Sequence, residues 1–352
     1  MNPLVPVSTD PGRTSASHRF QRLSVETGIR LALILAIFVV FAASAEDFLS
    51  PGNLYSILSQ FALLGLITAA LGVTMIAGEF DLSVGAMVSV SAVITLKVSD
   101  AYSPIVGLLA GIATGALVGV FNGILVAFLR LSSLVVTVGT LVLLTGIAYQ
   151  IANNSVVSYD NFDVSSAVDD PIAQILSARS LITIGILVLL GLVLRFLRGG
   201  RYLYAVGGNR AAAFAMGLPV DRTIVLSMTA SATLAALAGG LLAFSLLGAS
   251  PTTGGSLLLQ GASAAMLGGI ALSGGVGTAT GMALGALTLT ALNSGLSLQG
   301  VSSALIALIN GLVLLIVIVL NARNLGTVNG LLVRMSRPLH SFRGRTENSN
   351  GR

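Results

Sequence analysis

The stretch ILSQFALLGLITAALGVTMIAGEFDLSVGAMVSVSAVITLKV, residues 57–98, decides the fold. It is apolar almost throughout, except at its centre, where GEFDLSVG at 78–85 contributes Glu79 and Asp81. An apolar helix of about 20 residues can cross about 30 Å of hydrocarbon, and the stretch holds one window of nearly that length on each side of the two acids. We therefore predict two membrane-spanning helices, 57–77 and 82–98, joined by a short polar break.

The same pattern recurs along the chain, whose 352 residues are 55% hydrophobic and only 9% charged. Such a composition is far from that of an ordinary soluble domain. We predict an all-α, polytopic bundle in which a membrane domain at 29–322 lies between tails at 1–28 and 323–352. Its expected spans are 29–45, 57–77, 82–98, 104–128, 134–152, 180–197, 223–247, 257–272, 277–296 and 302–321. Eight spans would result if two short glycine-rich windows near the Leu-Ser-x-Gly stretches are re-entrant.

The positions of the basic residues predict the orientation of the chain. Short cytoplasmic loops hold an excess of Lys and Arg, and with the N-terminus inside only Lys97 and Arg179 of the 18 basic residues fall outside. Both termini are therefore expected in the cytoplasm, and the chain in the cell (inner) membrane as a multi-pass protein. The net charge of +5 is read as a topology signal, so no nucleic-acid partner is expected.

Several kinds of chemistry are excluded by what the sequence lacks. Cysteine is absent and the two histidines, His18 and His340, lie in the tails, so no disulfide and no Cys- or His-ligated metal site is expected within the membrane domain. No Gly-x-x-x-x-Gly-Lys-Ser/Thr motif occurs, which excludes a P-loop nucleotide site. The apolar spans offer no nucleophile with a neighbouring base. We therefore expect a protein that is not an enzyme and binds no cofactor.

Glycine-rich segments predict close helix packing and an internal similarity. The 41 glycines include GIATGALVG and GMALGAL, and small residues allow helices in lipid to approach closely. GEFDLSVG at 78–85 aligns with GGIALSGG at 268–275, and GIATGALVGVFN at 111–122 with GMALGALTLTALN at 281–293. Either two related halves or chance similarity in a Gly/Ala/Leu-rich chain explains this alignment.

The two acids of the break have two interpretations. Asp81 directly precedes a helix, whose free N–H groups its carboxylate can cap. Alternatively, Glu79 and Asp81 line a wet pathway at its cytoplasmic end and gate release. Since GGIALSGG keeps the Leu-Ser-x-Gly turn without either acid, the turn does not require them. We favour Asp81 as a cap and Glu79 as a pathway residue, with Ser83 beside them.

The loop at 195–222 is the one sizeable cytoplasmic feature between spans. Its segment GNRAAAFAMGLPV has Asn209 at an N-cap position, Gly217 at the C-terminal stop and Pro219 beyond, which predicts a short helix at the membrane surface. Two turns are marginal alone in water. The helix therefore requires a docking surface, which is either a partner protein or its own bundle.

The segments GEFDLSVGA, NGILVAFLRLSSLVVTVGTLVLLTGIA, RYLYAVGGNRAAAFAMGL and SPTTGGSLLLQGASAAMLGGIALSGGVGTATGMALGALTLTALNSGLSLQGVS together resemble the ribose/galactose/xylose-type permease subunit of bacterial ATP-binding-cassette (ABC) importers. The similarity covers roughly residues 30–322. It implies two permease chains, as a homodimer or heterodimer, an ABC ATPase subunit that uses ATP and Mg, and an extracytoplasmic binding protein that delivers a sugar or small polyol.

The resemblance also implies a site for coupling to the ATPase, because GGN-x-AA is similar to the family's coupling helix. Its residues here are Gly208, Asn209, Arg210, Ala211, Ala212, Phe214, Met216, Gly217 and Leu218. Arg210 and Phe214 stand where the family more often has polar or acidic residues, which bears on the choice of ATPase. Polar residues inside spans either bond between helices or contact sugar hydroxyls, and the pathway candidates are Asn122, Thr137, Asn293 and Asn310. The rival functions are a branched-chain amino acid permease and an ion-coupled secondary transporter.

Overall fold

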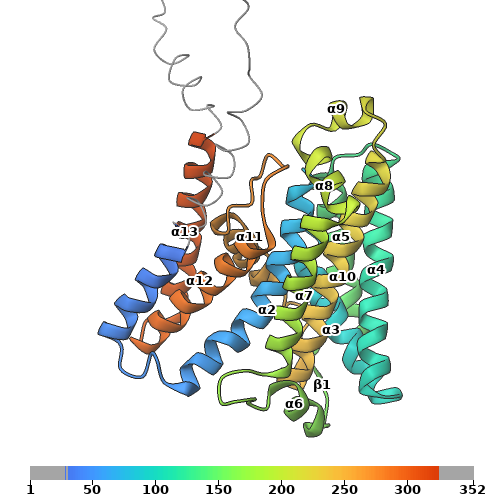
Figure 1. Cartoon of the computed structure of the whole chain (residues 1–352). Helices are drawn as coiled ribbons and strands as arrows, with labels where there is room; N and C mark the ends of the chain where they lie inside the picture. The colour runs from blue at the N-terminus through green and yellow to red at the C-terminus, as the bar shows by residue number, and fades with distance from the viewer. Residues whose placement is uncertain (1–27, 29–30, 325–352) are drawn as a thin grey trace, which may run out of the picture.

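The computed structural model describes residue 28 and residues 31–324. Most of the two expected terminal tails, with both histidines, therefore lies outside the described residues. The described part is almost entirely helical (Figure 1), which confirms the all-α prediction. Two two-residue strands, β1 (Val157–Ser158) and β2 (Gly248–Ala249), pair antiparallel with Val157 opposite Ala249.

Each of the ten predicted windows coincides with a helix. After a first helix, Leu31–Ser44, these are α2 (Pro51–Ile76), α3 (Val84–Ala101), α4 (Pro104–Ala127), α5 (Ser133–Ile151), α7 (Ala178–Phe196), α10 (Val220–Leu246), α11 (Gly255–Leu267), α12 (Ala279–Leu298) and α13 (Ser303–Asn324). Shorter helices lie in two of the loops: α6 (Phe162–Asp169), α8 (Arg198–Gly208) and α9 (Arg210–Ala215).

Among the described residues seven helices are long and apolar enough to cross a membrane, and three apolar stretches are shorter: Leu31–Ser44, Gly255–Leu267 and the Ser303–Val319 part of α13. The 13 residues of α11 extend about 20 Å at 1.5 Å per residue, less than the hydrocarbon thickness. The number of crossings and the orientation stay predictions. α2 begins six residues earlier than predicted, because Ser50 caps it and Pro51 occupies its first turn. In the sequence alone, both residues indicate a loop.

Close packing through glycine, predicted from the sequence, is confirmed in α4. Its glycines recur at every fourth residue and so share one face: Gly107, Gly111, Gly115, Gly119 and Gly123. The first two face α3 and the other three face α10, and a Cβ on Gly119 would lie only 2.5 Å from the Cα of Thr229. Any side chain here would push the helices apart.

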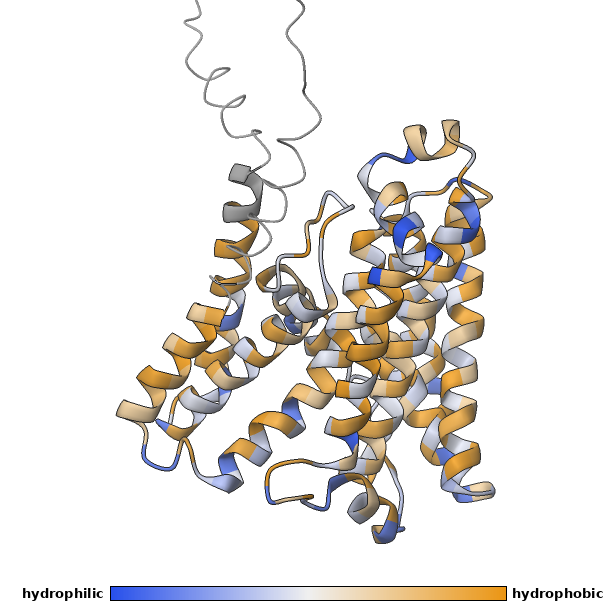
Figure 2. Cartoon of the chain, viewed as in Figure 1, coloured by the Kyte–Doolittle hydropathy of each residue, from blue (hydrophilic) through white to orange (hydrophobic). Residues whose placement is uncertain are grey.

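The core and the lipid-facing surface separate clearly. In α2 83% of the most apolar 18-residue window is buried, against 22% in α4 and α7, so α2 lies at the centre of the bundle and α4 and α7 at its periphery. The exposed residues of these peripheral helices are mostly apolar, for example Leu109 and Leu117. Hydrophilic residues gather at the two ends, around α8–α9 and around α6 (Figure 2), as expected for a membrane-spanning body.

Candidate pathway break and coupling surface

The break between α2 and α3 is where the sequence placed it. α2 ends at Ile76 because Gly78 takes a left-handed conformation with φ +81°, which glycine adopts without steric cost. The N–H of Glu79 then bonds to the carbonyl of Thr74 at 3.0 Å and closes the last turn. α3 begins at Val84, so residues 77–83 form an irregular segment between the helices.

Asp81 is fully buried in this segment and accepts three hydrogen bonds. Two come from Ser83, from its N–H at 3.0 Å and its hydroxyl at 2.5 Å, and the third comes from the hydroxyl of Ser231 in α10 at 3.0 Å. The expectation that Asp81 caps α3 therefore needs correction: Ser83 occupies the N-cap position and Asp81 satisfies an N–H before the helix. One of its three bonds joins the break to another helix, α10.

The remaining polar groups around the break are bonded within the chain. Asn122 of α4 donates to the Ser83 hydroxyl at 3.2 Å and accepts from Thr140 of α5 at 2.6 Å. Thr137 accepts from the N–H of Leu82 at 3.1 Å. These bonds fix the break to α4, α5 and α10. Two of the predicted pathway residues, Asn122 and Thr137, thus hold the break in place.

Glu79 lies on the other side of the break, toward α9. It forms an ion pair with Arg210, with 3.1 Å between the guanidinium Nη1 and the carboxylate Oε1. Burial raises the pKa of the Glu79 carboxyl above its ordinary value of 4.5, against the opposing effects of a hydrogen bond with Ser133 and the charge of Arg210. The structure therefore joins a predicted pathway residue to a predicted coupling residue.

The short helix predicted in the cytoplasmic loop is present as α9. The Asn209 side chain accepts from the N–H of Ala212 at 2.9 Å, and Gly217 follows the helix with φ +73°. Two apolar side chains project from it, with Phe214 70% and Met216 79% exposed. An open groove of about 470 Å³ beside Phe214 is lined by Arg130, Arg210, Ala211, Val220 and Asp221. The helix α8, which precedes it, was not predicted.

Two further grooves flank α11. One, of about 160 Å³, has the hydroxyls of Ser89, Thr145 and Thr252 in its wall. The other, of about 150 Å³, lies between α11 and α13 and is lined by Ser256, Leu259, Gln260, Ser263, Ala307, Asn310, Gly311 and Leu314. The amide oxygens of Asn310 and Asn293 are buried without a hydrogen-bond partner among the described residues. Of these two predicted pathway residues, only Asn310 lines a groove.

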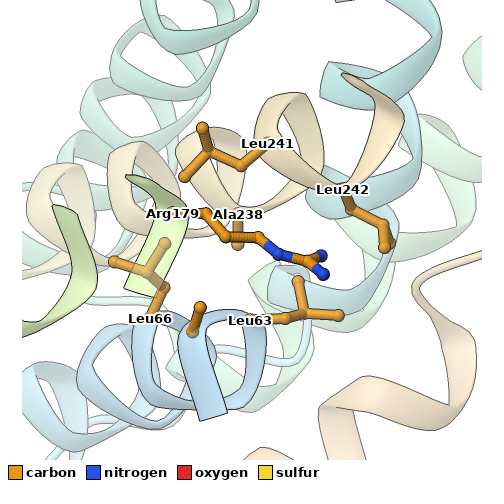
Figure 3. Close-up of a pocket in the computed structure, with 7 residues that line it drawn as sticks. Leu63, Leu66, Arg179, Ala238, Leu241 and Leu242 are labelled. Atoms are coloured by element: carbon orange, nitrogen blue, oxygen red, sulfur yellow. The ribbon is translucent and has the colours of Figure 1, made fainter. Parts of the chain in front are cut away.

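A partly buried cluster at the opposite end was missed by sequence reasoning. Arg179, at the start of α7, lies among Leu63, Leu66 and Leu242 of α2 and α10 (Figure 3). Its Nε is 2.7 Å from a carboxylate oxygen of Asp169 in α6, and a cavity of about 10 Å³ adjoins it. Asp169 also accepts from Ser245 at 2.5 Å. This cluster holds α6 against α7 and α10. Its only signal in the sequence was an arginine on the side of the membrane whose predicted loops are otherwise acidic.

Comparison with known proteins finds permease components of transport systems. The family described as "Branched-chain amino acid transport system / permease component" matches residues 53–318. The L-arabinose ABC transporter permease protein of Azospirillum brasilense is 31% identical over 81% of this chain and 84% of its own length. The ribose import permease protein of Bacillus subtilis is 30% identical over 86% of this chain and 95% of its own.

A third relative has a different named substrate. The autoinducer 2 import system permease protein of an Enterobacter species is 34% identical over 91% of this chain and 92% of its own length. No solved structure matches the chain.

Proposed function

The chain belongs to the family of membrane permease components described for branched-chain amino acid transport, and from this premise we propose that it forms the transmembrane pathway of an ATP-driven importer for a sugar or a related small polyol. The observation that carries the proposal is α9, a capped helix in the loop predicted to be cytoplasmic, which presents two exposed apolar side chains in a chain without a P-loop. Energy from ATP can reach such a chain only by contact with another polypeptide.

An ABC ATPase subunit is the proposed partner of α9. Exposed aromatic and apolar side chains act as anchors when they enter a partner's pocket, and Phe214 and Met216 lie on a segment raised from the end of the bundle (Figure 1). The adjacent groove, with Arg130 and Asp221 in its wall, offers charges that orient the docked subunit. ATP and Mg would bind to that subunit.

Delivery of substrate is assigned to an extracytoplasmic binding protein at the opposite end. There the ion pair of Arg179 with Asp169 holds α6 against the bundle, so the surface available for docking is preformed. The exposed apolar face of α13, with Leu308, Leu312 and Leu315, suits contact with a second permease chain or with lipid. Two chains, identical or different, would then enclose the pathway.

A sugar is the substrate class that we favour over an apolar amino acid. A sugar hydroxyl needs hydrogen-bonding partners along its path, and Gln260, Ser263 and Asn310 are among the residues that line the groove between α11 and α13. The arabinose and ribose permeases among the relatives support the same class. Weak binding suffices, because the binding protein supplies selectivity.

Two alternatives are less well supported. The family description mentions branched-chain amino acids, whereas the relatives compared above are named for arabinose, ribose and autoinducer 2. An ion-coupled secondary transporter would need ionisable groups inside the membrane in both halves, whereas only the 78–85 stretch has them and its counterpart GGIALSGG has none.

The experiment is to co-express the chain with its ATPase and compare wild type with Phe214→Ala. Loss of an interface anchor costs about 1–3 kcal/mol of association, so the yield of ATPase that co-purifies should fall at matched membrane levels. Val138→Ala, which shortens an exposed apolar side chain of α5, is the matched control and should change nothing. Equal yields from wild type and Phe214→Ala would remove α9 from the interface.

A further inference from the structure

The junction of α8 and α9 is packed through backbone alone. Gly207 is the penultimate residue of α8, and the position that a Cβ on Gly207 would occupy overlaps with the carbonyl oxygen of Ile76 and lies 2.8 Å from the nitrogen of Gly275. The N–H of Gly275 in turn donates to that same carbonyl at 2.9 Å. Three segments therefore meet at a point where no side chain fits: the end of α2, the end of α8 and the turn before α12.

The two turns that meet here are the stretches that aligned in the sequence. GEFDLSVG supplies Gly78 and GGIALSGG supplies Gly274, with φ of +81° and +83°, which few other residues adopt. A Cβ on Gly274 would lie 2.5 Å from the carbonyl oxygen of Gly207 and 2.7 Å from the Cα of Gly78. The hydroxyl of Tyr204 adds a bond to the carbonyl of Gly277 at 2.8 Å. Both turns thus contact the segment that carries α9.

The ion pair of Arg210 with Glu79 ties the first residue of α9 to the same break. The Arg210 side chain is 44% exposed and the Glu79 side chain 11% exposed, so solvent reaches and screens the pair from the Arg210 side. The pair links the proposed docking helix to a break that is fixed to α4, α5 and α10.

We propose that the ion pair and the glycine contact together transmit displacement of α9 to the α2–α3 break and to the turn before α12. Glu79 and Arg210 are then positioning residues for coupling. The inference rests on the proposed function, because the ATPase is what displaces α9. The backbone contact at Gly207 has no side chain to yield, and the bonds of Asp81 prevent the break from absorbing the movement locally.

The test uses a single cysteine at Phe80, a half-buried residue of the break, in a chain that has no other. In the complex with the ATPase, ATP should change the rate at which this thiol is labelled. Glu79→Arg or Arg210→Glu alone should reduce that change about three- to tenfold, and the double exchange should restore it, because the opposite charges again face each other. Arg201→Glu, the same charge change in the neighbouring helix α8, should leave it intact.

A second pair of variants tests the glycine contact. Gly207→Ala should abolish the ATP-dependent change in labelling, whereas Gly208→Ala, at a position with open space around it, should retain it. Co-purification of the ATPase is measured for wild type and for every variant. If no ATPase binds the wild-type chain, the proposed function is refuted, and this outcome is distinct from a failure of the inference. Where the ATPase binds, an undiminished ATP response in Glu79→Arg, or a double exchange that does not recover it, overturns the inference.

Discussion

The bonds of Asp81 predict how much the break contributes to stability. In Asp81→Ala the Ser231 hydroxyl can turn to a carbonyl of its own helix, but the N–H and hydroxyl of Ser83 lose their acceptor in a fully buried place. Hydrogen bonds to charged groups contribute about 1.5–3 kcal/mol each. After part of this is offset by the relief of burying a charge, we expect a loss of about 2–4 kcal/mol in the free energy of unfolding.

Asp81→Asn separates the acceptor from the charge. The amide oxygen can still accept from Ser83 and the amide nitrogen can donate to Ser231, so the expected cost is below about 1 kcal/mol. The free energy of unfolding of wild type, Asp81→Ala and Asp81→Asn is measured on the purified chains in mixed micelles. Unfolding is monitored as the loss of helical circular dichroism with increasing denaturing detergent. Asp100→Ala, at the exposed end of α3, is the control and should lie within about 0.5 kcal/mol of wild type.

Two results would refute this reasoning. If Asp81→Ala unfolds at the same detergent concentration as Asp100→Ala, the bonds to Ser83 and Ser231 contribute nothing. If Asp81→Asn is as unstable as Asp81→Ala, the stability of the break depends on the negative charge of Asp81 and not on its role as a hydrogen-bond acceptor.

Three further predictions follow from other parts of the structure. Since the pKa of Glu79 is raised in the folded chain, its ionised form opposes folding at pH values above that pKa, and this cost disappears on acidification. Acid should therefore weaken coupling but not the fold, so the ATP-driven uptake of wild type should drop as the pH falls toward the raised pKa of Glu79. The Glu79→Gln chain, whose uptake is already impaired, should show no such drop and should have the same circular dichroism as wild type. Gly119→Ala should lose about 1–3 kcal/mol by overpacking α4 against α10, measured by detergent unfolding, whereas Gly139→Ala, with open space around it, should lose nothing. A cysteine at exposed Ser166 in α6 should react with an impermeant thiol reagent in intact cells and one at Met216 only after the membrane is opened; the reverse pattern would invert the orientation.

Local signals in the sequence were sufficient for much of the fold. Apolar windows located the helices, glycine-rich segments predicted close helix packing, and Asn209 with Gly217 predicted α9. α8 was missed because RGGRYLYAVGG is weakly apolar and contains four glycines, which lowers helix propensity. It makes a tertiary contact at its C-terminal end, since Gly207 packs directly against the backbone of Ile76 in α2.

The contacts of the candidate site could not be predicted, because they join residues far apart in the chain. Glu79 and Arg210 are 131 residues apart, and Asp81 and Ser231 are 150 apart. Each residue had a plausible local explanation, Asp81 as a cap and Arg210 as a contact for a partner. Only the arrangement of α2, α8 and α10 in space places these side chains in contact.

The most direct test of the central claim is uptake by the assembled transporter. The chain, its ATPase and its binding protein are reconstituted in proteoliposomes, and entry of labelled L-arabinose, D-ribose, D-fructose and L-leucine is followed with and without ATP. We predict ATP-dependent accumulation of a sugar, and none when the ATPase is omitted or carries an inactivated nucleotide site. Accumulation of leucine instead, or sugar entry driven by an ion gradient without ATP, would contradict the account.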